Sequence, residues 1–335
     1  MHPRPRRQRF TFDSHHVGVW ILTGAILLFL AFAAPNFFNA GNLQSVLNDS
    51  AILGIGALAM TLLIMAGAFD LSVSSIMGLA PIAGLMLGGA YGPVVMLTSI
   101  LAGALLGLVN GLIVTRGNVA PFVATLGTLF VYGSIGAIVT NGNATFVSSP
   151  FLFNLSLGVV LGVIPYSFFI LIAVFLLCAG LLTRLHIGRW IRAAGSNLRA
   201  SHVNGIDLRY VYLALFTLTG ALTGLAGIIL SGYLASAIVT QAPSYNLSAI
   251  SAVVVGGTSL RGGEGSLIGS VLASILFSMV NNGLILCGVD SYWQYLAIGV
   301  VLVIALTLGV AIEWIRQWVE VLGRPVKPPI GSQTG

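Results

Sequence analysis

The stretch TRLHIGRWIRAAGSNLRASHVNGIDLRY, residues 183–210, decides the topology of this chain, because it is the only long polar run between the two ends of an otherwise apolar sequence. It carries five arginines against a single acid, Asp207. Apolar segments of membrane-spanning length lie on both sides, and arginine-rich loops between such segments stay in the cytoplasm. We therefore expect the middle of the chain to face the cytosol.

A short helix is expected inside this stretch. Asn197 is a residue type that caps helix N-termini, and Gly205 suits a left-handed end, so we expect residues 198–204 to be helical. Spacing alone leaves a second interpretation open, in which the arginines only fix the orientation of the chain.

The composition is that of an integral membrane protein. The chain has 57% hydrophobic and 7% charged residues, whereas soluble domains have about 25% charged residues. Its long apolar runs favour helices, which satisfy their own backbone polar groups in lipid. The net charge of +6 does not indicate nucleic-acid binding, because the basic residues lie before the first apolar segment, in the central loop and after the last segment. Cys178 and Cys287 have no histidine or acid at ligand spacing and predict neither a disulfide nor a metal site.

Apolar segments of about 20 residues, enough to cross about 30 Å of hydrocarbon, predict an all-α polytopic bundle of about ten transmembrane helices. The eighth is too short to be secure and could be re-entrant. Ten spans place a basic N-terminal tail of residues 1–16 and a C-terminal tail of residues 313–335 in the cytoplasm, on either side of a transmembrane domain of residues 17–312. The expected spans are 17–34, 46–69, 72–91, 93–115, 119–140, 158–182, 211–231, 246–260, 266–287 and 292–312.

A weak internal sequence similarity suggests a repeat. The segment NGLIV at 110–114, near the end of the fourth span, resembles NGLIL at 282–286, near the end of the ninth. Spans that are five apart run in opposite directions, so an inverted repeat of five plus five spans would produce this relation.

Asp70 stands between two long apolar runs, in AGAFDLSVSSIMGL at 66–79. A charge at membrane depth is costly unless it faces a cavity, a partner or an interface. Ser72, Ser74 and Ser75 are expected to cap the helix that follows. Two interpretations stay open: a break between helices at a transport path, or an interfacial carboxylate stabilised by the helix dipole.

No catalytic, metal or cofactor site is expected. The loop GGTSLRGGEGS at 256–266 is rich in glycine but is not followed by Gly-Lys-Ser/Thr, so it is not a nucleotide-binding P-loop. It predicts a tight connection between spans, or a flexible joint beside a pathway. His186 and His202 lack paired acids at metal spacing, and no carboxylate pair suggests a general acid and base.

Four segments together resemble the permease subunits of ribose-type ATP-binding-cassette (ABC) importers of bacteria. They occur in the order of that family and span most of residues 45–310. The segments are GAFDLSVSS at 67–75, NGLIVTRGNVAPFVATLGT at 110–128, AAGSNLRASHVNGI at 193–206, and AISAVVVGGTSLRGGEGSLIGSVLASILFSMVNNGLILCGVDSYWQ at 249–294.

The resemblance implies a multi-pass permease of the bacterial inner membrane that imports a monosaccharide and has no ATPase of its own. It implies four kinds of partner: cytoplasmic ATPase subunits, a periplasmic sugar-binding protein, a second permease chain that is either identical or a paralogue, and the lipid bilayer. The loop 183–210 then resembles the segment that docks into the ATPase. The contact residues implied are Gly195, Ser196, Asn197, Leu198, Arg199 and Ala200.

Polar residues at membrane depth are the candidates for lining a sugar pathway that binds weakly, because tight binding would slow release. These are Asp70, Ser72, Asn110, Thr125, Asn281, Asn282 and Trp293. Two other transport functions stay open from the residues alone: an ion- or proton-coupled secondary transporter of a small polar solute, and a passive channel or structural membrane subunit. A single convincing intramembrane acid, Asp70, counts against proton coupling, and the absent catalytic sets disfavour an enzyme.

Overall fold

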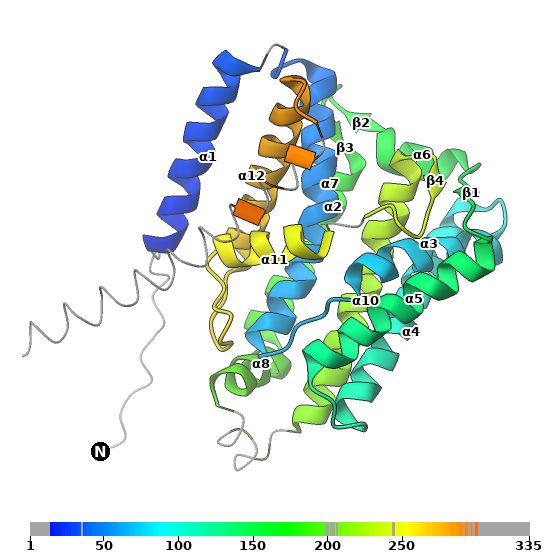
Figure 1. Cartoon of the computed structure of the whole chain (residues 1–335). Coiled ribbons are helices and arrows are strands. Elements are labelled where there is room, and N and C mark those ends of the chain that lie inside the picture. The colour runs from blue at the N-terminus through cyan, green and yellow to red at the C-terminus, as the bar shows by residue number, and fades with distance from the viewer. Residues whose placement is uncertain are drawn as a thin grey trace, which may run out of the picture.

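The computed structural model describes residues 14–34, 36–197, 207–242 and 245–290, with isolated positions between these ranges and up to residue 300 (Figure 1). This part of the chain is mostly helical. The helices are α1 (Ser14–Ala33), α2 (Ala40–Met65), α3 (Val73–Gly88), α4 (Gly92–Thr115), α5 (Pro121–Thr140), α6 (Pro150–Leu157), α7 (Tyr166–Arg184), α8 (His186–Ser196), α10 (Leu208–Tyr233), α11 (Tyr245–Val255) and α12 (Leu267–Leu286).

Each of the first nine predicted spans coincides with a helix, namely α1 to α5, α7 and α10 to α12. The tenth, 292–312, falls almost wholly outside the described residues, as do the two predicted tails. Among the described helices, six are long and apolar enough to cross a membrane: α2, α4, α5, α7, α10 and α12.

Two of the predicted spans are short helices. α3 has 16 residues, about 24 Å at 1.5 Å per residue, although we expected it to cross as 72–91. α11 has 11 residues, about 16 Å by the same rise. In Figure 1, α3 begins about halfway along α2, because residues 66–72 run back beside α2 as an extended segment. α3 therefore begins at a break in the chain inside the bundle.

The connection between α5 and α7 contains structure that the sequence did not predict. α6 lies there, and α7 begins at Tyr166, eight residues later than expected, because residues 158–165 form a hairpin. Its turn has positive φ at Leu161 and Gly162. Four two-residue strands pair antiparallel as β1–β4 and β2–β3: β1 (Thr145–Phe146), β2 (Val159–Val160), β3 (Ile164–Pro165) and β4 (Ser236–Ala237).

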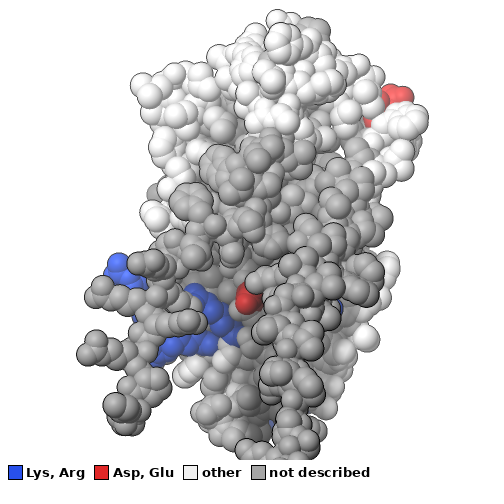
Figure 2. All heavy atoms as spheres, turned by 90° about the vertical axis from the view of Figure 1, so that its left-hand side faces the viewer, with Lys and Arg blue, Asp and Glu red and all other residues white. Residues whose placement is uncertain are grey.

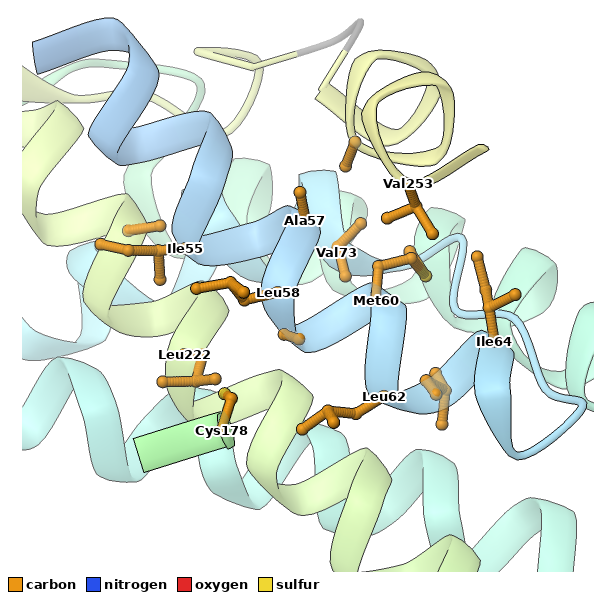
Figure 3. Close-up of a cluster of buried hydrophobic side chains, with 14 of the residues drawn as sticks. Ile55, Ala57, Leu58, Met60, Leu62, Ile64, Val73, Cys178, Leu222 and Val253 are labelled. Carbon is orange, nitrogen blue, oxygen red and sulfur yellow. The ribbon is translucent and has the colours of Figure 1, made fainter. Parts of the chain in front are cut away.

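Helix α2 is the centre of the bundle. Its apolar window is 89% buried inside the protein, and residues of α7, α10 and α11 contribute to the same hydrophobic cluster. Figure 3 shows this cluster, with Leu58 and Leu62 of α2 near Cys178 and Leu222, and Val253 on the opposite side of α2. A membrane helix surrounded by other helices can carry polar groups that lipid would not tolerate.

Glycines bring helices α4 and α10 into close contact. A Cβ atom at Gly224 would lie 2.5 Å from the Ser99 carbonyl oxygen, and one at Gly103 would overlap the Gly220 carbonyl oxygen. Small residues at intervals of three or four allow such approach in membranes. These glycines therefore serve the packing of α4 against α10.

Candidate functional site

Residues 66–72 form a break between α2 and α3 that contains the buried Asp70. The Asp70 side chain is fully buried. Its Oδ1 accepts hydrogen bonds from the Ser72 backbone nitrogen at 2.8 Å and from the Ser72 hydroxyl at 2.6 Å. The Asn110 amide nitrogen donates to the Ser72 hydroxyl at 2.7 Å and lies 3.4 Å from Asp70 Oδ2. Neutral donors thus surround this carboxylate and hold the extended segment in place.

The start of α3 is capped by a distant side chain. We had expected its own serines to form the cap. Ser72 makes no capping hydrogen bond through its side chain, because its hydroxyl donates to Asp70. Asn246 of α11 performs this role: its Oδ1 accepts from the Ser74 backbone nitrogen at 2.9 Å, and its Nδ2 donates to the Leu71 carbonyl oxygen. Sequence reasoning missed Asn246, although a lone asparagine in an apolar helix was the available signal.

Thr125 and Tyr132 complete the group of residues around Asp70. We call this group the Asp70 network: Asp70, Ser72, Asn110, Thr125 and Tyr132. The Thr125 hydroxyl donates to the Pro121 carbonyl oxygen at 2.8 Å and lies 3.4 Å from the Phe69 carbonyl oxygen. The Tyr132 hydroxyl lies 3.0 Å from Asn110 Oδ1. Four of the seven predicted pathway residues therefore lie together, all of them buried. Their role in lining a pathway stays a prediction.

The other three predicted pathway residues lie elsewhere. Asn282 of α12 exchanges two hydrogen bonds with Asn42, at 2.8 and 2.9 Å. Asn42 is the third residue of α2, so this pair lies about 35 Å along the helix from the break. Asn281 is half-buried beside it, and Trp293 is exposed beyond the end of α12. The predicted set thus divides between the start of α3 and the far end of α2.

The central polar stretch contains a helix that the sequence analysis did not predict. In α8, Gly188, Ile191 and Ala194 are buried, whereas Arg189 is exposed. The signal was the three- and four-residue spacing of Ile187, Ile191 and Ala194, which is typical of an amphipathic helix. The expected helix at 198–204 lies mostly outside the described residues, but Gly205 does have positive φ and Ser201 is helical.

The end of α8 packs against the core through backbone atoms. A Cβ atom at Gly195 would overlap the Met65 carbonyl oxygen and the Gly263 nitrogen. A side chain at position 195 would therefore point toward the end of α2 and the glycine-rich loop 256–266, and the contact of Gly195 with an ATPase stays a prediction. Ser196 and Asn197 are exposed. Leu198, Arg199 and Ala200 lie outside the described residues.

Basic side chains gather at the end of the molecule that carries α8, which we call the α8 end. Figure 2 shows the described Lys and Arg side chains in the lower half of the view only, the half in which α8 lies in Figure 1. Exposed arginines here include Arg184, Arg189 and Arg261. Among the described residues, no three His, Cys, Asp or Glu side chains gather into a group that could hold a metal ion.

The described residues thus form a helical bundle of membrane-spanning type, with a basic, amphipathic helix, α8, packed against the end of α2. Residues 42–306 match the family described as "Branched-chain amino acid transport system / permease component". The chain belongs to this family and is a permease component of an ABC importer, a transport subunit and not an enzyme.

Named relatives match the chain over most of its length. The ribose import permease protein of Escherichia coli K12 is 37% identical over 290 residues, which cover 84% of this chain and 90% of the relative. The ribose import permease protein of Bacillus subtilis 168 is 35% identical and covers 90% and 95%. The fructose import permease protein of Rhizobium meliloti is 30% identical and covers 89% and 84%. No solved structure matches the chain.

Proposed function

We propose that this chain carries a monosaccharide of the ribose or fructose type across the bacterial inner membrane, driven by a separate ATPase. The observation that carries the proposal is the similarity to two sugar import permeases over 84% or more of the chain and 90% or more of each relative. Such coverage includes the Asp70 network, the central basic stretch and the glycine-rich loop together.

The proposed partners are ATPase subunits on the cytoplasmic face, a periplasmic sugar-binding protein on the opposite face, and a second permease chain. The contact with the ATPase is proposed for residues 195–200, in which Ser196 and Asn197 are exposed and Gly195 joins them to the core. ATP binding would move α8, and two packings of the bundle would alternate. No covalent chemistry on this chain is required.

The proposed topology has ten membrane segments and cytoplasmic termini. The basic side chains at the α8 end support this orientation. The two short helices count as segments, because broken helices are tolerated where protein surrounds them. The proposed pathway runs beside the break, where the Asp70 network fixes the backbone, and toward Asn281, Asn282 and Trp293 near the opposite end.

An inverted repeat is proposed for α2–α4 and α10–α12. Each set consists of a long helix, an extended segment, a short helix and another long helix. In Figure 1, α2 runs toward the α8 end and α10 away from it, and α4 and α12 are likewise opposed. Asn110 and Asn282 occupy the matching long helices. This order supports the inverted repeat suggested by the similarity between NGLIV and NGLIL.

Uptake by a reconstituted complex tests the function. We expect vesicles that contain this chain, its ATPase and the binding protein to import labelled ribose or fructose only when ATP is present. Arg199→Glu should abolish import while leaving membrane insertion intact. Import by vesicles with this chain alone, collapsed by an uncoupler, would instead establish a secondary carrier. Import that needs neither ATP nor binding protein would establish a channel.

Labelling tests the orientation. A membrane-impermeant maleimide added outside right-side-out vesicles should modify the exposed Cys287, which follows the far end of α12. It should not modify an Asn197→Cys variant in which Cys287 is replaced by serine. Rapid labelling at position 197 from outside would contradict the proposed topology.

A further inference from the structure

Three segments that are distant in sequence meet at Gly195: the end of α8, the end of α2 and the loop between α11 and α12. We infer that Gly195, Gly262 and Gly263 form a rigid joint. Through this joint, a displacement of α8 moves the break at residues 66–72 and the glycine-rich loop 256–266 together. This inference rests on the proposed function, because it concerns how ATP-driven motion enters the chain.

The joint is rigid because backbone meets backbone. The Gly263 nitrogen donates to the Met65 carbonyl oxygen at 2.8 Å. A Cβ atom at Gly262 would lie 2.9 Å from the Gly195 Cα atom, and one at Gly263 would lie 2.5 Å from the Ser196 hydroxyl. At Gly195 and Gly262 the nearest atoms are backbone atoms, so no rotamer change there can absorb a relative shift.

The joint lies beside two connections: the break at residues 66–72, which leads to α3, and the glycine-rich loop 256–266, which follows α11. Met65 is the last residue of α2, and the chain enters the break at residues 66–72 directly from it. Gly262 and Gly263 lie in the loop that leads from α11 to α12. The Tyr212 hydroxyl adds α10 to the assembly, because it donates to the Ala66 carbonyl oxygen at 3.1 Å.

A second tie lies deeper in the bundle. Asn246 of α11 holds the Leu71 carbonyl oxygen and the Ser74 nitrogen at the start of α3. The chain around the break at residues 66–72 is therefore connected twice to α11 and its following loop. One connection is at the α8 end through Gly195, and the other is at the start of α3 through Asn246. A motion of α8 that displaced the break would have to displace α11 and its loop as well.

Gly195→Ala tests the joint, with Gly180→Ala on α7 as the matched control, because no atom lies within 4 Å of a Cβ atom at Gly180. At equal abundance of assembled complex, we expect Gly195→Ala to reduce ATP-dependent sugar uptake roughly tenfold. ATP hydrolysis should persist but lose its stimulation by sugar-loaded binding protein. The control should match the wild type in both assays. Uptake and stimulation at the wild-type level in Gly195→Ala would overturn the inference.

Hydrogen exchange in the wild-type complex gives a second test that stays decisive if Gly195→Ala does not assemble. The Gly263 nitrogen donates to the Met65 carbonyl oxygen across the joint, so the exchange rate of this amide reports whether the contact opens. A rigid joint predicts that the amide exchanges equally slowly with and without ATP. If ATP and sugar-loaded binding protein accelerate its exchange, the contact opens during transport and the joint is not rigid. Absence of uptake by the wild-type complex would count against the proposed function instead.

Discussion

The two ends of helix α2 are held in different ways. From the α8 end up to the start of α3, residues of α3, α4, α5, α8 and α11 contact the chain around residues 65–74, through the glycine joint, the Asp70 network and Asn246. At the far end, Asn42 pairs with Asn282, and residues 42–45 are only half-buried. The Asn48 amide nitrogen nearby is buried without a hydrogen-bond partner among the described residues.

This difference indicates where the bundle can change shape at low cost. A fully satisfied, buried polar network specifies one arrangement, because every alternative leaves a group unpaired. An interhelical amide pair in a membrane contributes only about 0.6 kcal/mol on average. We therefore expect the α8 end to move as a unit and the far end to separate more readily.

The largest effect is expected where the network loses its central acceptor. Asp70→Ala would leave the Ser72 nitrogen and hydroxyl without their acceptor in a buried site, while the Asn110 amide would keep only the Ser72 hydroxyl as a partner. We expect a loss of about 3 kcal/mol of stability, since each unsatisfied buried group costs about 1–3 kcal/mol. The measurement is the unfolding midpoint of the purified chain in detergent.

Asp70→Asn is the matched control for that experiment. It keeps an oxygen that can accept from Ser72 and removes the charge, so it should lose clearly less stability than Asp70→Ala. Equal unfolding midpoints for the two variants would show that the charge, and not the hydrogen-bond acceptor, maintains the break.

A smaller effect is expected for Asn246, which connects α11 to the start of α3. Asn246→Ala leaves the Ser74 nitrogen and the Leu71 carbonyl oxygen unpaired in the core, at a cost of about 2 kcal/mol. Because α3 would lose its connection to α11, uptake by the assembled complex should fall as well. Ser251→Ala on α11 is the control, since the Ser251 hydroxyl bonds only within its own helix, to the Leu247 carbonyl oxygen. A normal uptake rate for Asn246→Ala would separate stability from transport at this position.

Hydropathy predicted the positions of the helices well, because a bilayer imposes the same length and apolarity on every span. The family could also be identified, because the motifs around Asp70, Asn110, Gly195 and Gly256 occur together in one order. The sequence did not reveal that α3 has 16 residues where 20 were expected, whereas it did indicate that the eighth span, which is α11, is short. An apolar residue buried by protein and one facing lipid look the same in a sequence, so only the fold shows which helix is surrounded.

The candidate site was predicted in part for a related reason. Asp70, Ser72, Asn110 and Thr125 could be found as polar residues at depth, and they do lie together. Asn246 was missed because its partners are backbone atoms 172 and 175 residues away. The inward face of Gly195 was also missed, because a close backbone contact leaves no trace in the sequence except the glycine itself.

The smallest effect is expected at the far end, and it gives the sharpest test of the comparison. Asn42→Ala and Asn282→Ala, alone and combined, form a double-mutant cycle across the amide pair. If this pair holds the far end together only weakly, the coupling energy between the two side chains should be about 0.6 kcal/mol and below about 1.7 kcal/mol. The same variants should leave coupling between ATP hydrolysis and uptake intact, because neither residue contacts the glycine joint. A coupling energy as large as the loss in Asp70→Ala would mean that both ends of α2 are fixed, and that the bundle must change shape somewhere other than along this helix.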